Sequence, residues 1–478
     1  MTTTHPARLY ARKTTRPISG EFVLYWMQVT HRAHHNPALN YAVERANELG
    51  VPVVVYHVLR PDYPWASDRI HTFILESVSD LYRDFSARGI PYGFYLQAQG
   101  RMDAQAQGDP NARRSPLVAL AERAALVVTD YFPTFIVPRQ TKALREKVET
   151  PVIAVDSCGV IPLSLVSREH LTARGFRTEV ERLIPEFLHP VGDVEPRVRT
   201  PVDFGFDLTR PASGVGKKER NDYPPISTLV ARCDIDHSVA PSPVIRGGPT
   251  AARARLDAFL ATGLPRYAEE RGDPNADASS RLSPYLHFGN ISVQEVLLAA
   301  RDRGPTDQYV KFLDEAVVWR ELAHNLCHHN AKHRTVAAIP DWARKELADH
   351  EADPRQLYSP DDLEQARTGD ELWNAAQRSL HRDGELHNYV RMLWGKSVIG
   401  WTRDAASALS LLEHLNHKYA LDGRDPSSYG GILWCFGKFD RPFYRRPVFG
   451  TVRYMSTRAA RNKFDVEAYI RRHGEEGK

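Results

Sequence analysis

The chain carries two kinds of hydrophobic pattern, and the pattern changes near the middle. Through about residue 175, short apolar runs rich in Val, Ile, Phe and Tyr alternate with longer segments whose apolar residues recur at helical spacing. Such runs are typical of buried strands, and strands that alternate with helices predict an open parallel α/β sheet. The predicted strands are 22–27, 51–59, 91–96, 125–132 and 151–157, and the predicted helices between them include 40–49, 69–88 and 139–148.

The first predicted strand leads into the stretch QVTHRAHHNPAL (28–39) and not into a glycine-rich turn. A dinucleotide site of the GxGxxG kind needs glycines at this strand-to-helix turn, because the backbone must come close to the pyrophosphate. The sequence therefore argues against a nucleotide site of that kind after the first strand.

Beyond this first half the pattern becomes irregular and then helical. Residues 198–248 are rich in Pro, Gly and Ser, which is typical of a connection between domains. From Thr250 onward the apolar positions follow helical spacing, which predicts an all-α domain. We place an α/β domain at 1–180, a linker at 181–248 and a helical domain at 249–478. The predicted helices of the last are 250–262, 292–301, 307–326, 371–381, 385–402 and 404–417.

Composition narrows the class of protein. The 478 residues are 42% hydrophobic and 26% charged, which is ordinary for a globular chain. No run approaches the roughly 18 apolar residues of a membrane span, and the N-terminal residues lack the apolar core of a secretory signal. No CxxC pair occurs, so neither a zinc ribbon nor a disulfide framework is expected. We therefore expect a cytoplasmic monomer with no metal and no membrane partner. The four isolated cysteines are Cys158, Cys233, Cys327 and Cys435.

The formal net charge of +4 is too mild to indicate a nucleic-acid binder by itself. Between Phe436 and Arg461, however, basic residues are opposed only by Asp440 and are interleaved with aromatic ones. Cations beside flat rings suit phosphates and unstacked bases, and the alternative is a solvated basic surface over an edge of the core. The basic residues are Lys438, Arg441, Arg445, Arg446, Arg453, Arg458 and Arg461, and the aromatic ones are Phe439, Phe443, Tyr444, Phe449 and Tyr454.

A serine-rich turn precedes one of the helical segments. Ser279, Ser280 and Ser283 either cap that segment or hold a phosphate at its free N–H groups. Further along, His324 and His328 have the i, i+4 spacing of a metal pair on a helix, but no third ligand is evident near them. We therefore predict no metal site.

The predicted helix 385–402 has a wide apolar face. Arg391 on it needs an anionic partner if it is buried. Trp394 and Trp401 are seven residues apart, which places them about 10.5 Å apart along one stripe of a helix. Downstream, Asp422 and Asp425 lie in a tight turn that follows a predicted helix.

Six motifs of the helical half, in this order, resemble those of the class II cyclobutane pyrimidine dimer photolyases of the photolyase–cryptochrome family. They are SRLSPYLHFG (280–289), WRELAHN (319–325), WNAAQ (373–377), RMLWGK (391–396), LNHKYALDGRDP (415–426) and FGTVRYM (449–455). The N-terminal half adds YWM (25–27), VTD (128–130) and VDSCGVIP (155–162). The resemblance therefore covers almost the whole chain.

The resemblance implies a Rossmann-like antenna domain, a long linker and a helical domain that holds FAD. It also implies light-driven repair, in which reduced FAD gives an electron to a pyrimidine dimer in double-stranded DNA, the cyclobutane ring splits, and the electron returns. The resemblance also allows an antenna chromophore of the deazaflavin or folate type in the α/β domain.

Site residues follow from the matching motifs. For FAD binding, the resemblance implies the run Ser279, Ser280, Arg281, Leu282 and Ser283, together with Tyr267, Asn416, Arg391, Asp422 and Asp425. Asn416 would lie beside flavin nitrogen 5, and Arg391 and Asp422 would form an ion pair that adjusts to the flavin charge. A cation there would lower the cost of a flavin anion in a low-dielectric site.

The resemblance also implies electron-transfer and lesion-binding residues. Trp394, Trp373 and Trp401 would carry an electron, with Trp394 nearest the flavin and Trp401 at the surface. At the lesion, Glu321 would contact a thymine while Met392 and Trp434 form apolar walls. A pyrimidine dimer stacks poorly, so it flips out of the duplex more easily than a normal base pair. The expected DNA contacts are Arg441, Arg445, Arg446 and Arg453.

A second function stays open at this stage. A flavin photoreceptor of the cryptochrome type, without repair activity, would share the fold and the cofactor. Asn416, Glu321, Met392 and Trp434 favour repair over this photoreceptor. A third function, a photolyase-like protein that has lost repair, is supported only by the run CFGKFDRPFYRRP (435–447), which departs from the class II pattern.

Overall fold

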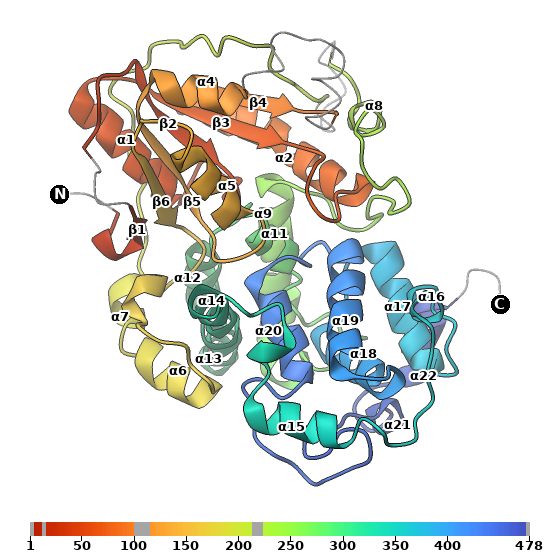
Figure 1. Ribbon diagram of the computed structural model, residues 1–478. Helices are drawn as coiled ribbons and strands as arrows, with labels where there is room; N and C mark the ends of the chain where they lie inside the picture. The colour runs from red at the N-terminus through yellow and green to blue at the C-terminus, as the bar shows by residue number, and fades with distance from the viewer. Residues whose placement is uncertain (1–3, 12–15, 100–114, 213–222, 475–478) are drawn as a thin grey trace.

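The computed structural model describes residues 4–11, 16–99, 115–212 and 223–474. A sheet with its helices forms the upper part in Figure 1, and a larger group of helices forms the lower part. The division into an α/β half and an all-α half confirms the predicted fold class. Within the described ranges, no helix is both long and apolar enough to cross a membrane.

One six-stranded sheet organises the first half, in the order β1-β6-β5-β2-β3-β4. All neighbouring strands are parallel except β1, which pairs antiparallel with β6. The predicted strands are confirmed, and only the two-residue β1 was not expected. The bounds are β1 Leu9–Tyr10, β2 Phe22–Met27, β3 Val53–Leu59, β4 Tyr92–Leu96, β5 Ala124–Tyr131 and β6 Val152–Asp156.

Helices cover both faces of this sheet, as expected for parallel strands. All six residues of β2 are buried. Val23, Tyr25 and Met27 join one core with helices α1 and α2, whereas the residues between them join another with α4 and α5. The helices are α1 Pro37–Leu49, α2 Asp68–Ala87, α4 Pro116–Arg123 and α5 Val137–Arg145.

The second half contains the helices that carry most of the predicted site residues. The longer ones are α9 Pro249–Ala258, α12 Val293–Arg303, α13 Thr306–Leu313, α14 Arg320–His329, α15 Asp341–Asp349, α17 Glu371–Asp383, α18 Asn388–Trp401, α19 Ala405–Tyr419, α20 Pro426–Cys435 and α22 Val466–His473. The shorter ones are η4 Phe259–Gly263, η5 Leu264–Arg266, α10 Tyr267–Glu270, α11 Ser283–His287, η6 Asp314–Trp319, η7 Val336–Ala338, α16 Pro360–Glu364 and α21 Thr457–Ala460. Of these, η4 and η6 are π-helical, and η6 interrupts the single helix predicted at 307–326.

The predicted linker packs on the sheet half instead of standing apart from it. Thr209 N donates to Phe94 O of β4 at 2.8 Å, and Phe204 belongs to the core on the α4 face. Helix α6 (Ala173–Val180) packs against η6 of the helical half, although the sequence-based boundary put it with the sheet. The remaining short elements are η1 Pro6–Arg8, η3 Leu163–Leu165, α7 Ile184–Phe187 and α8 Ile226–Val230. Linker residues 213–222 lie outside the described residues.

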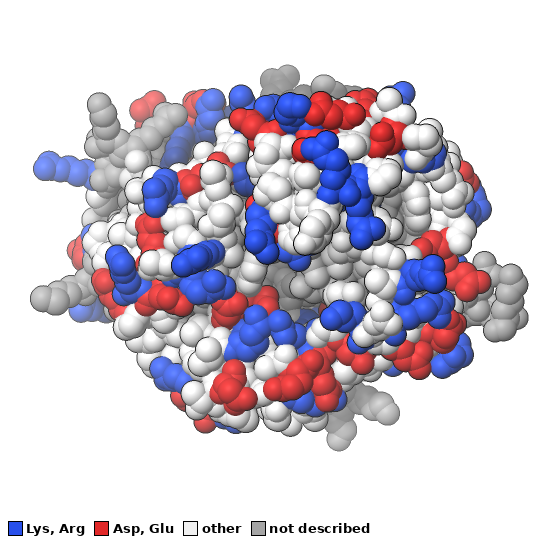
Figure 2. Space-filling view, turned by 90° about the horizontal axis from the view of Figure 1, so that it is seen from below, with Lys and Arg blue, Asp and Glu red and all other residues white. Residues whose placement is uncertain are grey.

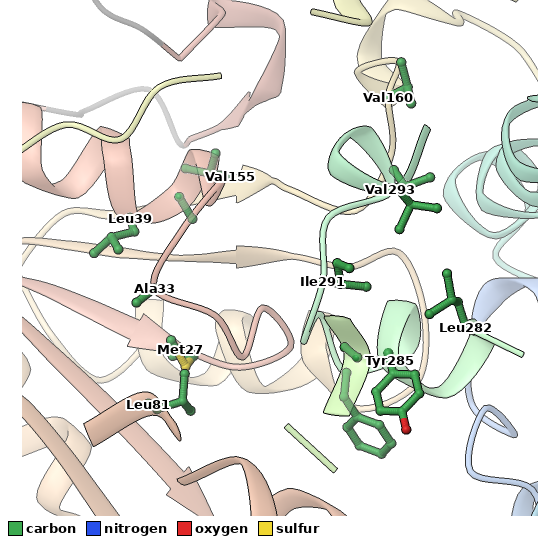
Figure 3. Packing of buried hydrophobic residues seen from close by; sticks show 14 of the residues in the cluster. Met27, Ala33, Leu39, Leu81, Val155, Val160, Leu282, Tyr285, Ile291 and Val293 are labelled. Carbon is green, nitrogen blue, oxygen red and sulfur yellow. The ribbon is translucent and has the colours of Figure 1, made fainter. Parts of the chain in front are cut away.

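The two halves share one core. Figure 3 shows Met27 and Leu39 of the sheet half in the same cluster as Tyr285 and Val293 of the helical half. A core that is continuous across the domain boundary resists relative movement, because packed interiors deform little.

Arg69 of α2 also fastens the two halves together. It is 2% exposed and donates to Leu380 O at 3.0 Å and to Tyr419 O at 2.7 Å. These carbonyls lie at the ends of α17 and α19, where a cation is favourable. The helices that carry Trp373 and Asn416 are therefore held in place by the sheet half.

Candidate functional site

An ion pair joins α18 to the turn that follows α19. Arg391 Nη2 lies 3.0 Å from Oδ1 and 3.3 Å from Oδ2 of Asp422. The two side chains are 21% and 11% exposed. Arg391 Nε is buried and has no hydrogen-bond partner among the described residues. The two residues thus form the expected pair, and one guanidinium N–H stays available for a ligand.

Asn416 lies near the end of α19 and is 2% exposed. Its Nδ2 donates to Gly423 O at 3.2 Å. The chain doubles back so closely that a Cβ on Gly423 would lie 2.5 Å from Asn416 O, an approach that only glycine permits. This fold-back places Asn416 and Asp422 on the two arms of one tight turn.

Arginine side chains shape the serine-rich turn. Arg255 donates to Ser279 O at 3.0 Å and to Ser280 O at 2.8 Å. Arg281 has a φ of 52°, and its Nε donates to Glu385 at 2.7 Å. Since Glu385 lies just before α18, this bond links the turn to the helix that carries Arg391.

The other residues assigned to the cofactor differ in their exposure. Ser283 is exposed at the start of the five-residue α11, whereas Leu282 is 1% exposed. Tyr267 is 7% exposed, and its ring centroid lies 5.8 Å from that of Phe259 and 5.3 Å from that of Phe312. The serines offer polar groups, while Leu282 and Tyr267 both belong to the buried hydrophobic core.

Asp425 caps α20. Its carboxylate accepts from Ser427 N at 2.8 Å and lies 3.4 Å from His287 Nδ1. Burial favours the neutral acid, but the hydrogen bond with His287 and the charge of Arg320 outweigh burial and lower the pKa of Asp425. The observed contacts of this carboxylate are structural, and a contact with the cofactor stays a prediction.

Three indole rings form a continuous row, called the tryptophan chain below. Trp394 and Trp373 stack with centroids 6.3 Å apart and 5° between their planes, and Trp401 meets Trp373 edge-on at 5.4 Å. The first two are 2% and 1% exposed, whereas Trp401 is half-buried. The order from the interior to the surface agrees with the one expected from the sequence.

Glu321 does not face the surface. It is 1% exposed, and its carboxylate accepts from Val160 N at 2.6 Å and from Ile161 N at 3.1 Å. Burial raises the pKa of Glu321 to about 7. The expected contact of this carboxyl with a lesion is therefore corrected: Glu321 fastens α14 to the loop that follows β6.

A carboxylate that sequence reasoning missed lies on the π-helical turn η6. Glu315 is 27% exposed and lies 3.3 Å from Arg271 Nε and 2.9 Å from Lys311 Nζ. Arg271 O in turn lies 3.1 Å from Nε2 of His387, the residue that precedes α18, one helical turn before Arg391. Short π-helical segments are frequent at functional sites, but no local sequence pattern indicated this one.

The expected apolar walls of a lesion site are both half-buried. Trp434 lies at the end of α20, and Met392 follows Arg391 on α18. Lys396 Nζ lies 4.9 Å from the centroid of the Trp434 ring, and the guanidinium carbon of Arg453 lies 5.4 Å from it. Trp434 is thus an indole with two cations beside it.

The basic stretch forms a loop between α20 and α21. Arg441, Arg445 and Arg446 are exposed, and Tyr444 between them is 92% exposed. Arg445 pairs with Glu346 at 2.8 Å. Figure 2, which views the lower end of Figure 1 near α15 and α21, shows Lys and Arg side chains around a hollow, with acidic residues mixed among them. Arg441 and Arg446 form no ion pair with another described residue, so these two are available to an anionic partner.

Two basic residues of this stretch, Lys438 and Arg453, form ion pairs within the protein. Lys438 is 3% exposed and lies 2.5 Å from Glu169 Oε1, so the expectation that it belongs to an exposed basic surface is corrected. Arg453 pairs with Asp440 at 2.7 Å and is only partly exposed.

The two histidines of the i, i+4 pair have separate partners. His324 Nδ1 lies 3.0 Å from Arg320 O, and His328 Nδ1 lies 2.6 Å from the Tyr131 hydroxyl. In the part of the chain that the structure describes, no group of three or more His, Cys, Asp or Glu residues could hold a metal ion.

Comparison with known proteins gives a consistent result. The family model described as DNA photolyase matches residues 23–181. A curated protein of Methanothermobacter thermautotrophicus named deoxyribodipyrimidine photo-lyase is 34% identical over 457 residues, which are 95% of each chain.

Solved structures have the same fold. A photolyase of Sulfolobus tokodaii described with two FAD molecules matches with a TM-score of 0.64 and 18% identity, over 95% of this chain and 90% of that one. A cryptochrome of Synechocystis matches with a TM-score of 0.67 and 17% identity, over 97% and 89% of the two chains. These two matches show the fold. The curated relative, whose similarity runs along 95% of the chain, and the matching family model show that the protein belongs to the DNA photolyase family.

Proposed function

We propose that this chain is a class II photolyase that splits cyclobutane pyrimidine dimers in double-stranded DNA with light. The observation that carries the proposal is the tryptophan chain, which runs from the buried Trp394 to the half-buried Trp401. Trp394 shares helix α18 with Arg391, whose ion pair with Asp422 is suited to a cofactor that changes its charge.

FAD fits the groups around this ion pair. Among the described residues, Arg391 Nε and His387 Nδ1 are buried without a hydrogen-bond partner, and such groups normally have one. Arg391 Nε offers a donor. His387 Nδ1 offers an acceptor, because Nε2 of the same ring donates to Arg271 O, so the two suit a ligand that carries both acceptors and donors, as FAD does. The serines of the 279–283 turn and Arg281 would hold its phosphates, and Asn416 would offer its amide to the flavin ring. When bound and reduced, FAD would supply an excited electron to the dimer and take it back after the ring splits.

The residues of this chain would then play distinct parts. Arg391 would lower the cost of a flavin anion, while Asp422 keeps the guanidinium in place. The tryptophan chain would pass electrons inward to restore the reduced cofactor after oxidation. Because indole is an easily oxidised side chain, closely spaced rings can carry the positive charge outward.

At the lesion, Trp434 and Met392 would form the apolar walls. The carboxylate role passes from Glu321 to Glu315, because Glu315 is partly exposed and is linked through Arg271 to His387, the residue that precedes α18. A water held by Glu315 would donate a hydrogen bond to a thymine carbonyl and stabilise charge that develops there. Arg441, Arg445 and Arg446 would bind DNA phosphates.

A photoreceptor without repair activity is the second candidate. The altered run 435–447 favours a protein without repair, because Asp440 in this run pairs with Arg453, which is then not free for DNA. An antenna chromophore of the deazaflavin or folate type, a monomeric state and a cytoplasmic location remain further parts of the main proposal.

Illumination of the reduced, FAD-loaded protein with an oligonucleotide that contains one dimer tests the proposal. Restored thymines, measured by direct product analysis, are expected in light and not in the dark. An undamaged oligonucleotide and chain loaded with oxidised FAD serve as controls. Photochemistry of the bound flavin without any restored thymine would favour the photoreceptor instead.

A further inference from the structure

Lys396 is a buried cation beside an indole ring. It lies on α18 with 0% exposure, and its Nζ lies 4.9 Å from the centroid of the Trp434 ring. The ammonium donates to Cys435 O at 2.6 Å, at the end of α20, where free carbonyls favour a cation. Burial lowers the pKa of Lys396 to about 8, so most of the amine still carries its proton at neutral pH.

The second cation beside Trp434 is partly neutralised. The guanidinium carbon of Arg453 lies 5.4 Å from the ring centroid, but Asp440 pairs with this guanidinium at 2.7 Å. Among the described residues no carboxylate forms an ion pair with Lys396. The positive field at the Trp434 ring therefore comes mainly from Lys396.

The tryptophan chain has a different environment. In the described ranges, no Lys or Arg lies over the ring of Trp394, Trp373 or Trp401. Instead, Trp394 donates its indole N–H to Gln377 Oε1 at 2.8 Å, and Trp373 donates to Trp394 O at 3.0 Å. An oxygen acceptor at the N–H stabilises an oxidised indole. A cation at the ring face destabilises it, because the attraction between ring and cation turns into repulsion.

We propose that Lys396 keeps Trp434 from giving up an electron, so that electrons reach the cofactor only through Trp394. This inference rests on the proposed function. One electron leaves Trp394, Trp373 refills Trp394, and Trp401 refills Trp373. A soluble thiolate then refills Trp401, and two thiolates oxidised in this way end as a disulfide. Trp434 stays neutral at the lesion wall, where a positive charge would capture the electron that is needed for ring splitting.

Light-driven reduction of bound FAD in a chain-blocked background tests Lys396. With a thiol as reductant, light-driven reduction of FAD should be blocked in Trp394→Phe. Adding Lys396→Met should restore reduction to about tenfold above that variant, because Trp434 becomes oxidisable. A third change, Trp434→Phe, should abolish it again. Lys396→Arg in place of Lys396→Met keeps the charge, so reduction should stay blocked.

A second readout needs no cofactor. The FAD-free full chain is exposed to the azidyl radical, an uncharged oxidant, and peptide mass spectrometry measures the oxidation of Trp434 relative to that of Trp319. Trp319 is the reference because it is 37% exposed and no cation among the described residues lies over its ring. Lys396→Met should raise this ratio severalfold. Lys438→Met removes another buried lysine, one that lies over a phenylalanine and not over an indole, and should leave the ratio unchanged.

The outcomes are distinguishable. If Trp394→Phe combined with Lys396→Met retains FAD but stays blocked, Lys396 has no such role, and the tryptophan chain is untouched by the result. If Trp394→Phe alone is reduced at the wild-type rate, the proposed chain itself fails, and the oxidation ratio of Trp434 decides the role of Lys396. If the lysine variant loses FAD, the oxidation ratio of Trp434 is again the deciding measurement. A ratio that Lys396→Met leaves unchanged overturns the inference.

Discussion

Trp373 donates its indole N–H to the main-chain carbonyl of Trp394 at 3.0 Å, while the two rings stack with 5° between their planes. The side chain of Trp373 on α17 is thereby fixed to the backbone of α18. A backbone carbonyl cannot rotate away from its partner as a side-chain acceptor could. The hydrogen bond and the stacking together hold the two rings in one relative orientation. A fixed ring contact is what rapid electron transfer requires, since the rate falls steeply with distance.

Replacement of Trp373 by Phe should block light-driven reduction of bound FAD. Phenylalanine fills most of the same space, but it is far harder to oxidise and has no N–H to donate. Repair by protein that is reduced chemically beforehand should stay near the wild-type level, because that electron passes directly to the lesion. Absorbance spectra under blue light measure the first effect, and product analysis measures the second.

Trp319→Phe is the matched control for this experiment. Trp319 is 37% exposed and lies outside the tryptophan chain, so its loss should leave light-driven reduction unchanged. Wild-type reduction in Trp373→Phe would mean that Trp373 only fills the core.

Glu321 should make the free energy of unfolding depend on pH. Burial raises its pKa from 4.5 to about 7 in the folded protein. The folded state therefore binds this proton more tightly than the unfolded state does. The stability it contributes is fully present below about pH 4.5 and is lost as the pH rises through about 7. The loss is on the order of 3 kcal/mol, at about 1.4 kcal/mol per pKa unit.

Glu321→Gln removes this titration and isolates its effect. Urea unfolding should show that the stability of the wild type relative to the variant falls by about 3 kcal/mol between about pH 4.5 and pH 8. A difference that is constant with pH for Glu321→Gln would contradict the assigned pKa.

Strands were predictable from the sequence because their neighbours bury most of their residues. Every residue of β2 is buried, so its run of apolar residues is unbroken. The edge strand β1 has only two residues and no such run. The π-helical turn η6 was not predictable, since one extra residue per turn depends on tertiary contacts and leaves no periodic trace in the sequence.

Site residues were predictable where the motif and the packing agree. Arg391 and Asp422 pair as expected, and the three indoles of the tryptophan chain meet in the expected order. The prediction that Glu321 contacts the lesion failed because a distant segment, the loop after β6, folds onto its side of α14. The prediction that Lys438 belongs to an exposed basic surface failed for the same reason, since its partner Glu169 lies more than two hundred residues earlier in the chain.

Arg441 should contribute to the salt dependence of DNA binding. It is exposed and has no carboxylate partner among the described residues. Duplex binding loses about 0.9 in the logarithm of affinity per tenfold rise in salt for each neutralised phosphate. Arg441→Ala should therefore make the slope shallower by up to about one unit if this side chain binds a phosphate. Titrations at several salt concentrations measure the slope.

Arg458→Ala is the comparison for Arg441→Ala, because it removes another exposed cation of the same stretch that is not among the proposed DNA contacts. It should change the slope less. An unchanged slope and affinity for Arg441→Ala would place that arginine outside the interface.

Trp434 should bind the lesion more than it stabilises the fold. Stacking of a base on an aromatic side chain contributes about 1–3 kcal/mol per base. Trp434→Ala should therefore weaken affinity for dimer-containing DNA by about 5- to 150-fold, with little change for undamaged DNA. The ring is half-buried and lies beside Lys396, so Trp434→Phe, which keeps an apolar wall, separates a lost contact from a disturbed helix end. Its affinity should lie between those of the wild type and Trp434→Ala, and the melting temperatures of all three should be similar. Equal affinity of the wild type for damaged and undamaged DNA would remove the lesion site altogether, and the photoreceptor would then be the better account of the same fold and the same tryptophan chain.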